Sequence, residues 1–182
     1  MSKTIEAIGR ELTRKDYIEL LTNYPKTNNE TLGNGVWFEY YKYKEDIQYF
    51  GPYGYKDGDK IVYTEDYSNA EYDYASWEWY TMAKGASDVK WTDPYYDEVS
   101  GITMITAAAP IYDKNNEFIG VVTSDMDLKV LQDIMKNIKI GETGKAYLLD
   151  TKGIYIAADE EEKVMKLHIT EDENEDLAQK SK

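Results

Sequence analysis

The chain of 182 residues is long enough for one packed domain and part of a second, because domains of roughly 100–150 residues are the usual unit of core formation. Its formal net charge of −14 repels phosphate backbones and attracts cations, which argues against nucleic-acid binding. Cysteine is absent and histidine occurs once, as His168, so disulfides, thiolate chemistry and sites built from several histidines are excluded. The 18 tyrosines and 4 tryptophans predict a surface or pocket lined with aromatic rings.

The first third of the chain combines a helical pattern with short strand patterns. Residues 4 to 22 carry apolar side chains at the spacing of an amphipathic helix, which we expect to end before Asn23 and Pro25. From Gly35 to Thr64, the aromatic and β-branched runs VWFEYYKY, IQYF and KIVYT predict antiparallel strands. The turn-rich stretch GPYGYKDGD between the last two runs is expected to be a loop.

The remaining elements follow in a regular order. Residues 74–84 contain neither Gly nor Pro and predict a short helix with an aromatic face, and WTDPYYDEVSG after it is expected to be a loop. The runs ITMITAAAPIY and EFIGVVTSDMD, joined by the polar DKNN, predict a β-hairpin. Residues 128–138 have helical periodicity and are followed by Gly141 as a stop signal. KAYLLD and GIYIAAD then predict two short strands before an acidic, weakly structured end.

Three pieces of this sequence occur in the order and approximate spacing found in the distal module of double Cache sensor domains. They are YDYASWEWYTMA at 72–83, WTDPYYD at 91–97, and API followed by GVVTSDMDL within 109–128. The resemblance implies an α+β fold with a PAS-like antiparallel sheet and a long N-terminal helix. It also implies a helix and connection over residues 1–34, a distal module over 35–138, and the start of a truncated proximal module over 139–182.

The resemblance further implies a ligand site in the distal module. Family members that bind amino acids hold the ligand carboxylate with a Tyr, an Arg and a Trp-Tyr pair, and hold the ligand ammonium with a Tyr and two Asp. The matching positions here are Tyr72, Trp79 and Tyr80 for the carboxylate, and Tyr95, Asp97 and Asp125 for the ammonium.

One position departs from this pattern, because Trp77 stands where the family has the arginine. An indole cannot replace the bidentate, charge-assisted bonds of a guanidinium to a carboxylate. The remaining carboxylates and aromatic faces, Trp77 included, suit a cation, and aromatic cages are a recurrent solution for methylated ammonium groups. We therefore predict a small amine or quaternary ammonium ligand of the choline or betaine type. An amino-acid ligand is the alternative if Lys84, Lys90 or backbone N–H groups take over the carboxylate.

Each proposed site residue also has a purely structural interpretation. Aromatic residues on a helix, such as Trp79 and Tyr80, are common in cores, and Asp97 and Asp125 are of a type that often hydrogen-bonds local backbone in turns. Asp125 and Asp127 alone are too few ligands to indicate a metal site.

Two other function classes remain open at this point. A carbohydrate-binding or carbohydrate-active protein would use the aromatic rings for sugar stacking and a pair of carboxylates as acid and base. The residues available for that pair are Asp93, Asp97, Glu98 and Asp125. Their spacing establishes no pair at catalytic separation. A structural adhesin is the third class, in which no small molecule would stabilise the fold.

The resemblance implies the ligand-sensing part of a bacterial transmembrane receptor of the chemotaxis type, on the extracytoplasmic side of the membrane. Such a domain is not an enzyme and needs no cofactor. Its expected partner is a small amine or amino acid, with no nucleic acid, and a homodimer is an open alternative for the intact receptor. No run of this sequence reaches the roughly 18–20 apolar residues of a membrane span, so membrane attachment is expected only through segments absent from this chain.

Overall fold

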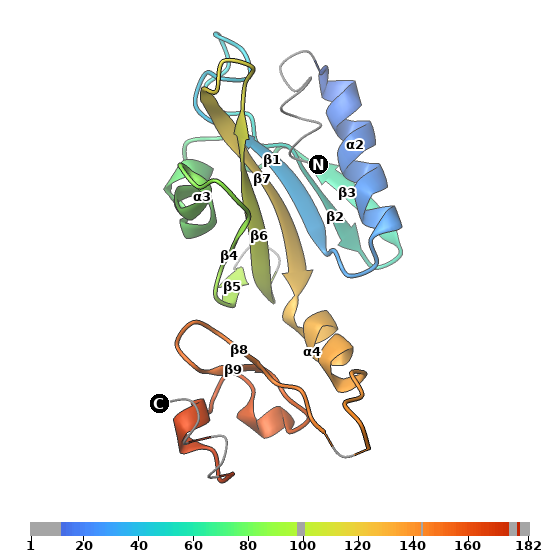
Figure 1. Ribbon diagram of the computed structural model, residues 1–182. Helices are drawn as coiled ribbons and strands as arrows, with labels where there is room; N and C mark the ends of the chain where they lie inside the picture. The colour runs from blue at the N-terminus through green and yellow to red at the C-terminus, as the bar shows by residue number, and fades with distance from the viewer. Residues whose placement is uncertain (1–11, 98–100, 143, 175–177, 179–182) are drawn as a thin grey trace. The chain divides into compact units, whose positions relative to one another are not determined.

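The computed structural model describes residues 12–97, 101–142, 144–174 and 178 (Figure 1). The contacts within the chain divide it into two compact units. One contains the residues up to Thr92 together with Thr106–Met126, and the other contains Asp93–Ile105 together with the residues from Asp127 onward. The domain boundaries expected after residues 34 and 138 stay a prediction.

The first unit is built on an antiparallel sheet in the strand order β3-β2-β1-β7-β6-β4. The strands are β1 (Gly33–Phe38), β2 (Tyr53–Asp57), β3 (Lys60–Thr64), β4 (Lys90–Trp91), β6 (Ile102–Tyr112) and β7 (Phe118–Asp127). The short β5 (Tyr95–Asp97) pairs with the start of β6, and both of these segments belong to the second unit. The α+β class, the antiparallel sheet and the β6–β7 hairpin predicted from the sequence are confirmed.

The strand β2 corrects the sequence prediction, because it forms inside GPYGYKDGD, which was expected to be a loop. The run IQYF was expected to be a strand and forms only an isolated bridge between Lys44 and Ile47. Gly54 explains the misassignment. A Cβ at this position would lie 2.4 Å from the carbonyl oxygen of Leu21, so the glycine admits the backbone of a packed helix and does not make a turn. The stretch WTDPYYDEVSG was likewise expected to be a loop, and it contributes strand residues to β4 and β5.

The helix α2 (Arg14–Thr27) covers one face of this sheet and buries Tyr17, Leu21 and Pro25 at a spacing of four residues. Residues 4–11 of the expected helix lie outside the described residues. The expected end before Asn23 is wrong, because the helix continues through Pro25 to Thr27. Proline removes only one helical N–H this close to the end. The side chains of Thr27 and Asn28 donate hydrogen bonds to the carbonyl of Tyr24, at 3.0 and 2.9 Å, and so stabilise the last turn.

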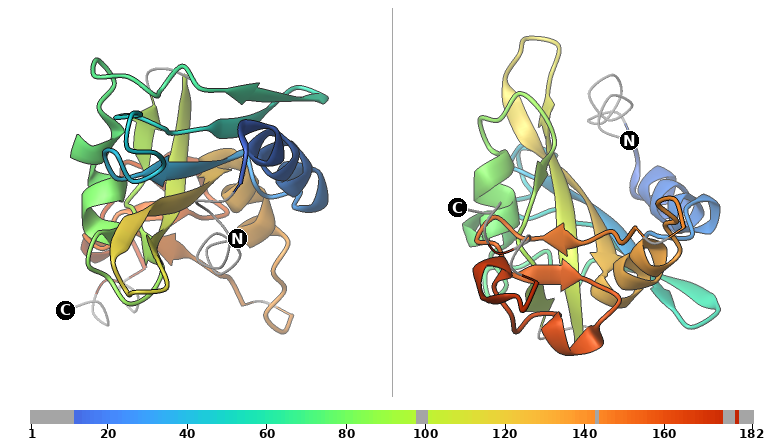
Figure 2. Two further views of the ribbon diagram at one scale, coloured as in Figure 1. Left: turned by 90° about the horizontal axis from the view of Figure 1, so that it is seen from above. Right: turned by 60° about the horizontal axis from the view of Figure 1, so that its bottom comes forward.

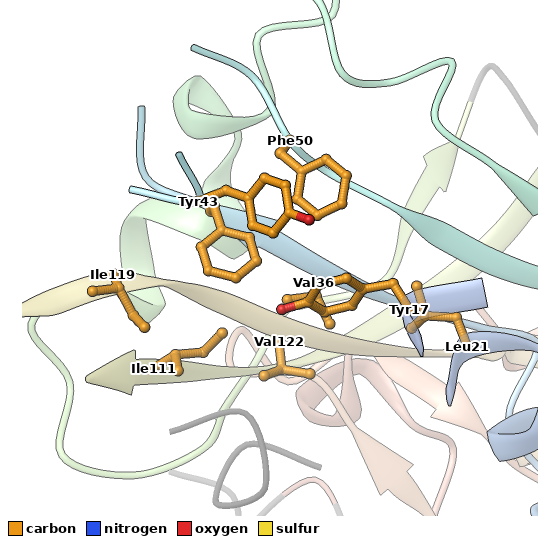
Figure 3. Close-up of a cluster of buried hydrophobic side chains, with 9 residues drawn as sticks. Tyr17, Leu21, Val36, Tyr43, Phe50, Ile111, Ile119 and Val122 are labelled. Carbon is orange, nitrogen blue, oxygen red and sulfur yellow. The ribbon is translucent and has the colours of Figure 1, made fainter. Parts of the chain in front are cut away.

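The core under α2 is largely aromatic. Tyr17 meets the rings of Phe38, Tyr43 and Phe50 edge-on, with centroid distances between 5.4 and 6.0 Å. Figure 3 shows Tyr17 beside Tyr43 and Phe50. Tyr43 and Phe50 stack at 3.8 Å. Aliphatic side chains from the strands and from α2 complete this core, namely Leu21, Val36, Ile111, Ile119 and Val122. These contacts fix the position of β1, whose opposite side carries the candidate site.

A capping box fixes the start of α2. The hydroxyl of Thr13 accepts from the N–H of Asp16 at 3.3 Å, and the carboxylate of Asp16 accepts from the N–H of Thr13 at 2.7 Å. We expect Thr13→Ala to lower the free energy of unfolding by about 1 kcal/mol, because it leaves helix N–H groups without this acceptor. Urea denaturation followed by circular dichroism measures the change. Thr13→Ser keeps a hydroxyl at this position and should retain most of the wild-type free energy of unfolding. A loss in Thr13→Ala no greater than in Thr13→Ser would contradict the expectation.

The other face of the sheet is covered by η2 (Tyr74–Ser76) and α3 (Glu78–Ala83), and Figures 1 and 2 show α2 and α3 on opposite sides. The helix predicted over residues 74–84 is thus present in two pieces, since Trp77 between them has extended backbone angles. This break turns α3 relative to η2 and brings the ring of Trp79 to 4.9 Å from the ring of Trp37 on β1.

The second unit contains α4 (Leu128–Lys136), the strand pair β8 (Leu148–Leu149) and β9 (Tyr155–Ala157), and the short helices η3 (Glu161–Lys163) and η4 (Ile169–Glu171). Its small core gathers around Tyr155, Ala158 and Val164. The buried carboxylate of Asp172 accepts hydrogen bonds from the hydroxyl of Tyr155 at 2.7 Å and from the ammonium of Lys163 at 2.9 Å. Within the described residues, no helix has the combined length and apolar content that crossing a bilayer requires.

Candidate functional site

Asp125 is a buried carboxylate on the α3 side of the first unit's sheet. It lies on β7 directly opposite Gly33 of β1, and the residue is 6% exposed. One carboxylate oxygen accepts from the hydroxyl of Tyr53 at 2.6 Å, and the other accepts from the hydroxyl of Thr106 at 2.7 Å. These two bonds fix the orientation of a negative charge within a largely aromatic surface.

Glycine in β1 lets Tyr53 reach this carboxylate. A Cβ on Gly33 would lie 2.1 Å from the hydroxyl oxygen of Tyr53, so any side chain there would displace the tyrosine. The next residue on the same face is Gly35, where a Cβ would lie 2.4 Å from the indole nitrogen of Trp37. The two glycines therefore leave the space in which these rings lie flat against the strand.

Trp37 is the centre of an aromatic cluster beside Asp125. Its indole N–H donates to the hydroxyl of Thr123 at 2.8 Å, and the residue is 3% exposed. Rings from three different segments surround it at centroid distances of 4.9 to 6.5 Å, namely Tyr53, Tyr67, Tyr72, Tyr74 and Trp79. Because Tyr53 contacts both Trp37 and Asp125, the carboxylate and the cluster form one continuous site.

The segment between β3 and α3 places Tyr72 and Trp77 at the outer end of this cluster. Their rings stack at 5.4 Å, and the indole N–H of Trp77 donates to the carbonyl of Tyr72 at 3.0 Å. Asp73 between Tyr72 and Tyr74 has a left-handed backbone with φ 42°. It is held by a hydrogen bond from the hydroxyl of Tyr40. Trp77 is 39% exposed while Trp79 is 5% exposed, so the cluster runs from solvent into the core.

Tyr80 follows Trp79 in sequence, but the two side chains have different neighbours: Trp79 packs on Trp37 and Tyr80 packs on Phe118. Its ring packs against Tyr74 and Phe118, and its hydroxyl donates to Glu39 at 3.3 Å. The residue is fully buried, and burial together with the charge of Glu39 raises the pKa of its hydroxyl well above the ordinary value. Tyr80 packs against Tyr74 and Trp79, two members of the cluster. Its expected contact with a ligand stays a prediction.

Tyr95 and Asp97 belong to the second unit. They form β5 and pair with Met104 and Ile102 of β6. Asp93, which precedes this strand, accepts bonds from the N–H and the hydroxyl of Thr151 at 3.2 and 3.1 Å. Burial raises the pKa of Asp93, and these hydrogen bonds outweigh that effect and lower the pKa overall. Tyr72, Trp77, Trp79 and Asp125 thus lie within the first unit. The ligand roles of all the residues expected in the site, Tyr95 and Asp97 included, stay predictions.

Several residues of this site were missed from the sequence, among them Trp37, Tyr53 and Thr106. Thr106 carried a usable signal, because the predicted hairpin places it on a strand that neighbours β7 and an antiparallel register brings it close to Asp125. Tyr53 carried none, since its segment has the composition of a turn. Trp37 was predicted to be a strand residue, and nothing in VWFEYYKY indicates which of its aromatic rings faces the site.

Neither lysine named as a substitute for the missing arginine is part of this arrangement. The ammonium of Lys84 forms an ion pair with Glu39 at 2.6 Å. Lys90 is exposed on β4, which lies at the end of the strand order. Across the described part of the chain, no group of three or more His, Asp or Glu side chains gathers to hold a metal ion. The chemistry present here is a buried carboxyl group, held by two hydroxyl groups, beside aromatic rings.

A separate hollow of about 430 Å³ lies along α4 in the second unit. Charged side chains of both signs line it, and an ion pair of 2.6 Å between Lys136 and Glu161 lies at its wall. None of the predicted ligand residues takes part in this hollow.

Comparison with known proteins identifies the family. Residues 17–133, more than half of the chain, match the family described as methyl-accepting chemotaxis protein-like, first PDC sensor domain. The methyl-accepting chemotaxis protein McpA of Pseudomonas putida is 38% identical over 98 residues, which are 53% of this chain and 15% of McpA. This chain therefore corresponds to a small part of the length of such a relative.

Solved structures agree with the family match. The structure described as methyl-accepting chemotaxis protein X is 25% identical with a TM-score of 0.69, and the alignment covers 92% of this chain and 68% of that one. The ligand-binding domain of the Campylobacter jejuni chemoreceptor Tlp3 in complex with L-valine has the same fold, with a TM-score of 0.60 at 20% identity, over 88% of this chain and 62% of that one. The Cache resemblance and the expectation of a domain that is not an enzyme are confirmed. The chain belongs to the family of methyl-accepting chemotaxis protein-like first PDC sensor domains.

Proposed function

We propose that this chain is the ligand-binding part of a bacterial transmembrane chemoreceptor and that it binds a small amine or quaternary ammonium compound on the extracytoplasmic side. The observation that carries the ligand class is the buried carboxylate of Asp125, held beside the aromatic cluster of Trp37. A cation placed there would meet an opposite charge and several π faces, and a desolvated cation–π contact contributes about 2 kcal/mol.

An α-amino acid is the competing ligand. The Tlp3 domain with the same fold was solved with L-valine, and an amino acid would place its ammonium at the same carboxylate. Its own carboxylate would then need a cationic partner. Trp77 stands at the expected arginine position, and Lys84 is engaged by Glu39, so the amine without a carboxylate is favoured.

Isothermal titration calorimetry with choline, glycine betaine and L-valine tests the ligand class. We expect choline to bind the wild type saturably and Asp125→Asn to weaken binding by roughly 30-fold or more, because the amide keeps the shape and removes the charge. Asp59→Asn, which changes an exposed carboxylate in the turn after β2, is the matched control and should bind like the wild type.

The other outcomes are equally informative. Binding of L-valine alone would show that the ligand is an amino acid and that another group replaces the arginine. Unchanged choline binding in Asp125→Asn would show that the ligand lies elsewhere. The absence of heat with all three compounds would remove the amine proposal and leave the family assignment in place.

A further inference from the structure

Asp125 presents a carboxylate whose hydrogen-bonding capacity is already partly used. A carboxylate has about four lone-pair sites. The hydroxyl of Tyr53 donates to one oxygen at 2.6 Å, and the hydroxyl of Thr106 donates to the other at 2.7 Å. A ligand at this position would share the carboxylate with two hydroxyl groups that already occupy lone pairs on both of its oxygens.

Strand pairing keeps both hydroxyls in place. The ring of Tyr53 lies over Gly33, directly opposite Asp125, and Tyr53 is itself paired with Gly35. The backbone of Thr106 is fixed by the segment after β4, since its N–H donates to the hydroxyl of Thr92 at 2.9 Å and its carbonyl accepts from the N–H of Thr92 at 3.0 Å. The strand pairing therefore places both hydroxyl groups beside the oxygens of Asp125.

Two indole N–H groups of the cluster are committed in the same way. Trp37 donates to Thr123 at 2.8 Å and Trp77 donates to the carbonyl of Tyr72 at 3.0 Å. The polar ends of these two side chains are bound within the protein, and their contribution to the cluster is aromatic surface. The site is consequently richer in negative potential and π surface than in hydrogen-bonding groups.

This balance discriminates between ammonium ions by their number of N–H groups. A primary ammonium has three donors, and each donor that is buried without an acceptor costs about 1–3 kcal/mol. A quaternary ammonium has none and interacts through charge and ring faces alone. We propose that Tyr53 and Thr106 are specificity-determining residues, which bias this site toward N-methylated ammonium ligands and against primary amines. The inference rests on the proposed function, because it requires the ammonium to bind beside Asp125.

A methylation series tests the inference by calorimetry. Ethanolamine, N-methylethanolamine, N,N-dimethylethanolamine and choline differ only in the number of methyl groups on nitrogen. We expect wild-type affinity to rise along the series, with choline bound about tenfold more tightly than ethanolamine. In Tyr53→Phe and Thr106→Val the ratio should fall to about threefold or less, mainly because ethanolamine gains the released acceptor.

Matched variants separate the hydroxyl effect from general damage. Thr106→Ser retains a hydroxyl and should keep the wild-type order, and Tyr41→Phe removes a hydroxyl from an exposed tyrosine and should change nothing. Circular dichroism confirms that each variant is folded, and Tyr53→Phe keeps the ring that packs on Trp37.

Equal affinity for all four amines, or an unchanged order in both Tyr53→Phe and Thr106→Val, would overturn the inference and leave the proposed amine site standing. If none of the four amines binds the wild type, the proposed ligand class fails and this inference fails with it.

Discussion

Replacing Trp37 by alanine is expected to lower the free energy of unfolding by about 3–5 kcal/mol. The side chain is 3% exposed and is surrounded by the rings of Tyr53, Tyr72 and Trp79, so its removal leaves a cavity that a sheet fixed by hydrogen bonds fills only in part. The substitution also leaves the buried hydroxyl of Thr123 without its donor. Urea denaturation followed by far-UV circular dichroism, which reports backbone structure and does not rely on tryptophan fluorescence, measures the loss.

The chain contains a matched control for this experiment. Trp91 on β4 is 56% exposed, so Trp91→Ala removes the same side chain from a solvent-facing position and should cost less than about 1 kcal/mol. Similar losses in Trp37→Ala and Trp91→Ala would show that Trp37 is not the packing centre described above. Because Trp37 also contributes to the candidate site, Trp37→Phe is the variant to use for binding, since it preserves most of the packing.

The second large effect is expected at Asp172, whose side chain is 1% exposed. The carboxylate accepts from the hydroxyl of Tyr155, from the N–H of Asn174 and from the ammonium of Lys163. We expect Asp172→Asn to lower the free energy of unfolding of the second unit by about 2–3 kcal/mol at pH 7, because the charge-assisted bonds are lost and Lys163 loses its counter-ion. Glu173→Gln, at the exposed neighbouring position, is the control and should change stability by no more than about 0.5 kcal/mol.

This effect should depend on pH in a defined direction. The hydrogen bonds from Tyr155, Asn174 and Lys163 lower the pKa of Asp172 to about 2 from an ordinary value of 3.8. A carboxylate with a depressed pKa in the folded state contributes stability that is fully present above its unfolded pKa and is lost as the pH falls through its folded pKa. The difference between wild type and Asp172→Asn should therefore be constant from pH 7 to about 5 and shrink between about pH 4 and pH 2. A difference independent of pH over that window would show that the charge of Asp172 does not contribute.

The parts of the fold that followed from the sequence are those with strong local patterns. β6 and β7 have long β-branched runs around a polar turn, and α4 has an apolar stripe followed by a glycine, so each element is determined largely by its own residues. β2 is different, because Gly54 is explained by the approach of Leu21 from α2 more than 30 positions earlier. A local pattern contains no information about that contact.

The candidate site shows the same division between local and distant information. Asp125 and Trp79 were assigned through the Cache resemblance, and the structure places both on one side of the sheet. The direction of Tyr80 could not be derived from its position beside Trp79, because it depends on packing against Phe118 and a bond to Glu39 from other parts of the chain. The role of Tyr53 depends on the absence of a side chain at Gly33, a condition set on a different strand.

All six residues of β1 are buried, because α2 covers one side of the strand and the aromatic cluster covers the other. A substitution in β1 therefore disturbs the core and the site together, and the strand has little freedom to change during evolution. The outer rings Tyr67, Tyr72 and Trp77 come instead from the connection between β3 and α3, where residues outside regular pairing vary at lower cost to stability. For the proposed ligand site, related sensor domains are thus expected to differ mainly in the residues of this connection, while the buried strand beneath it stays the same.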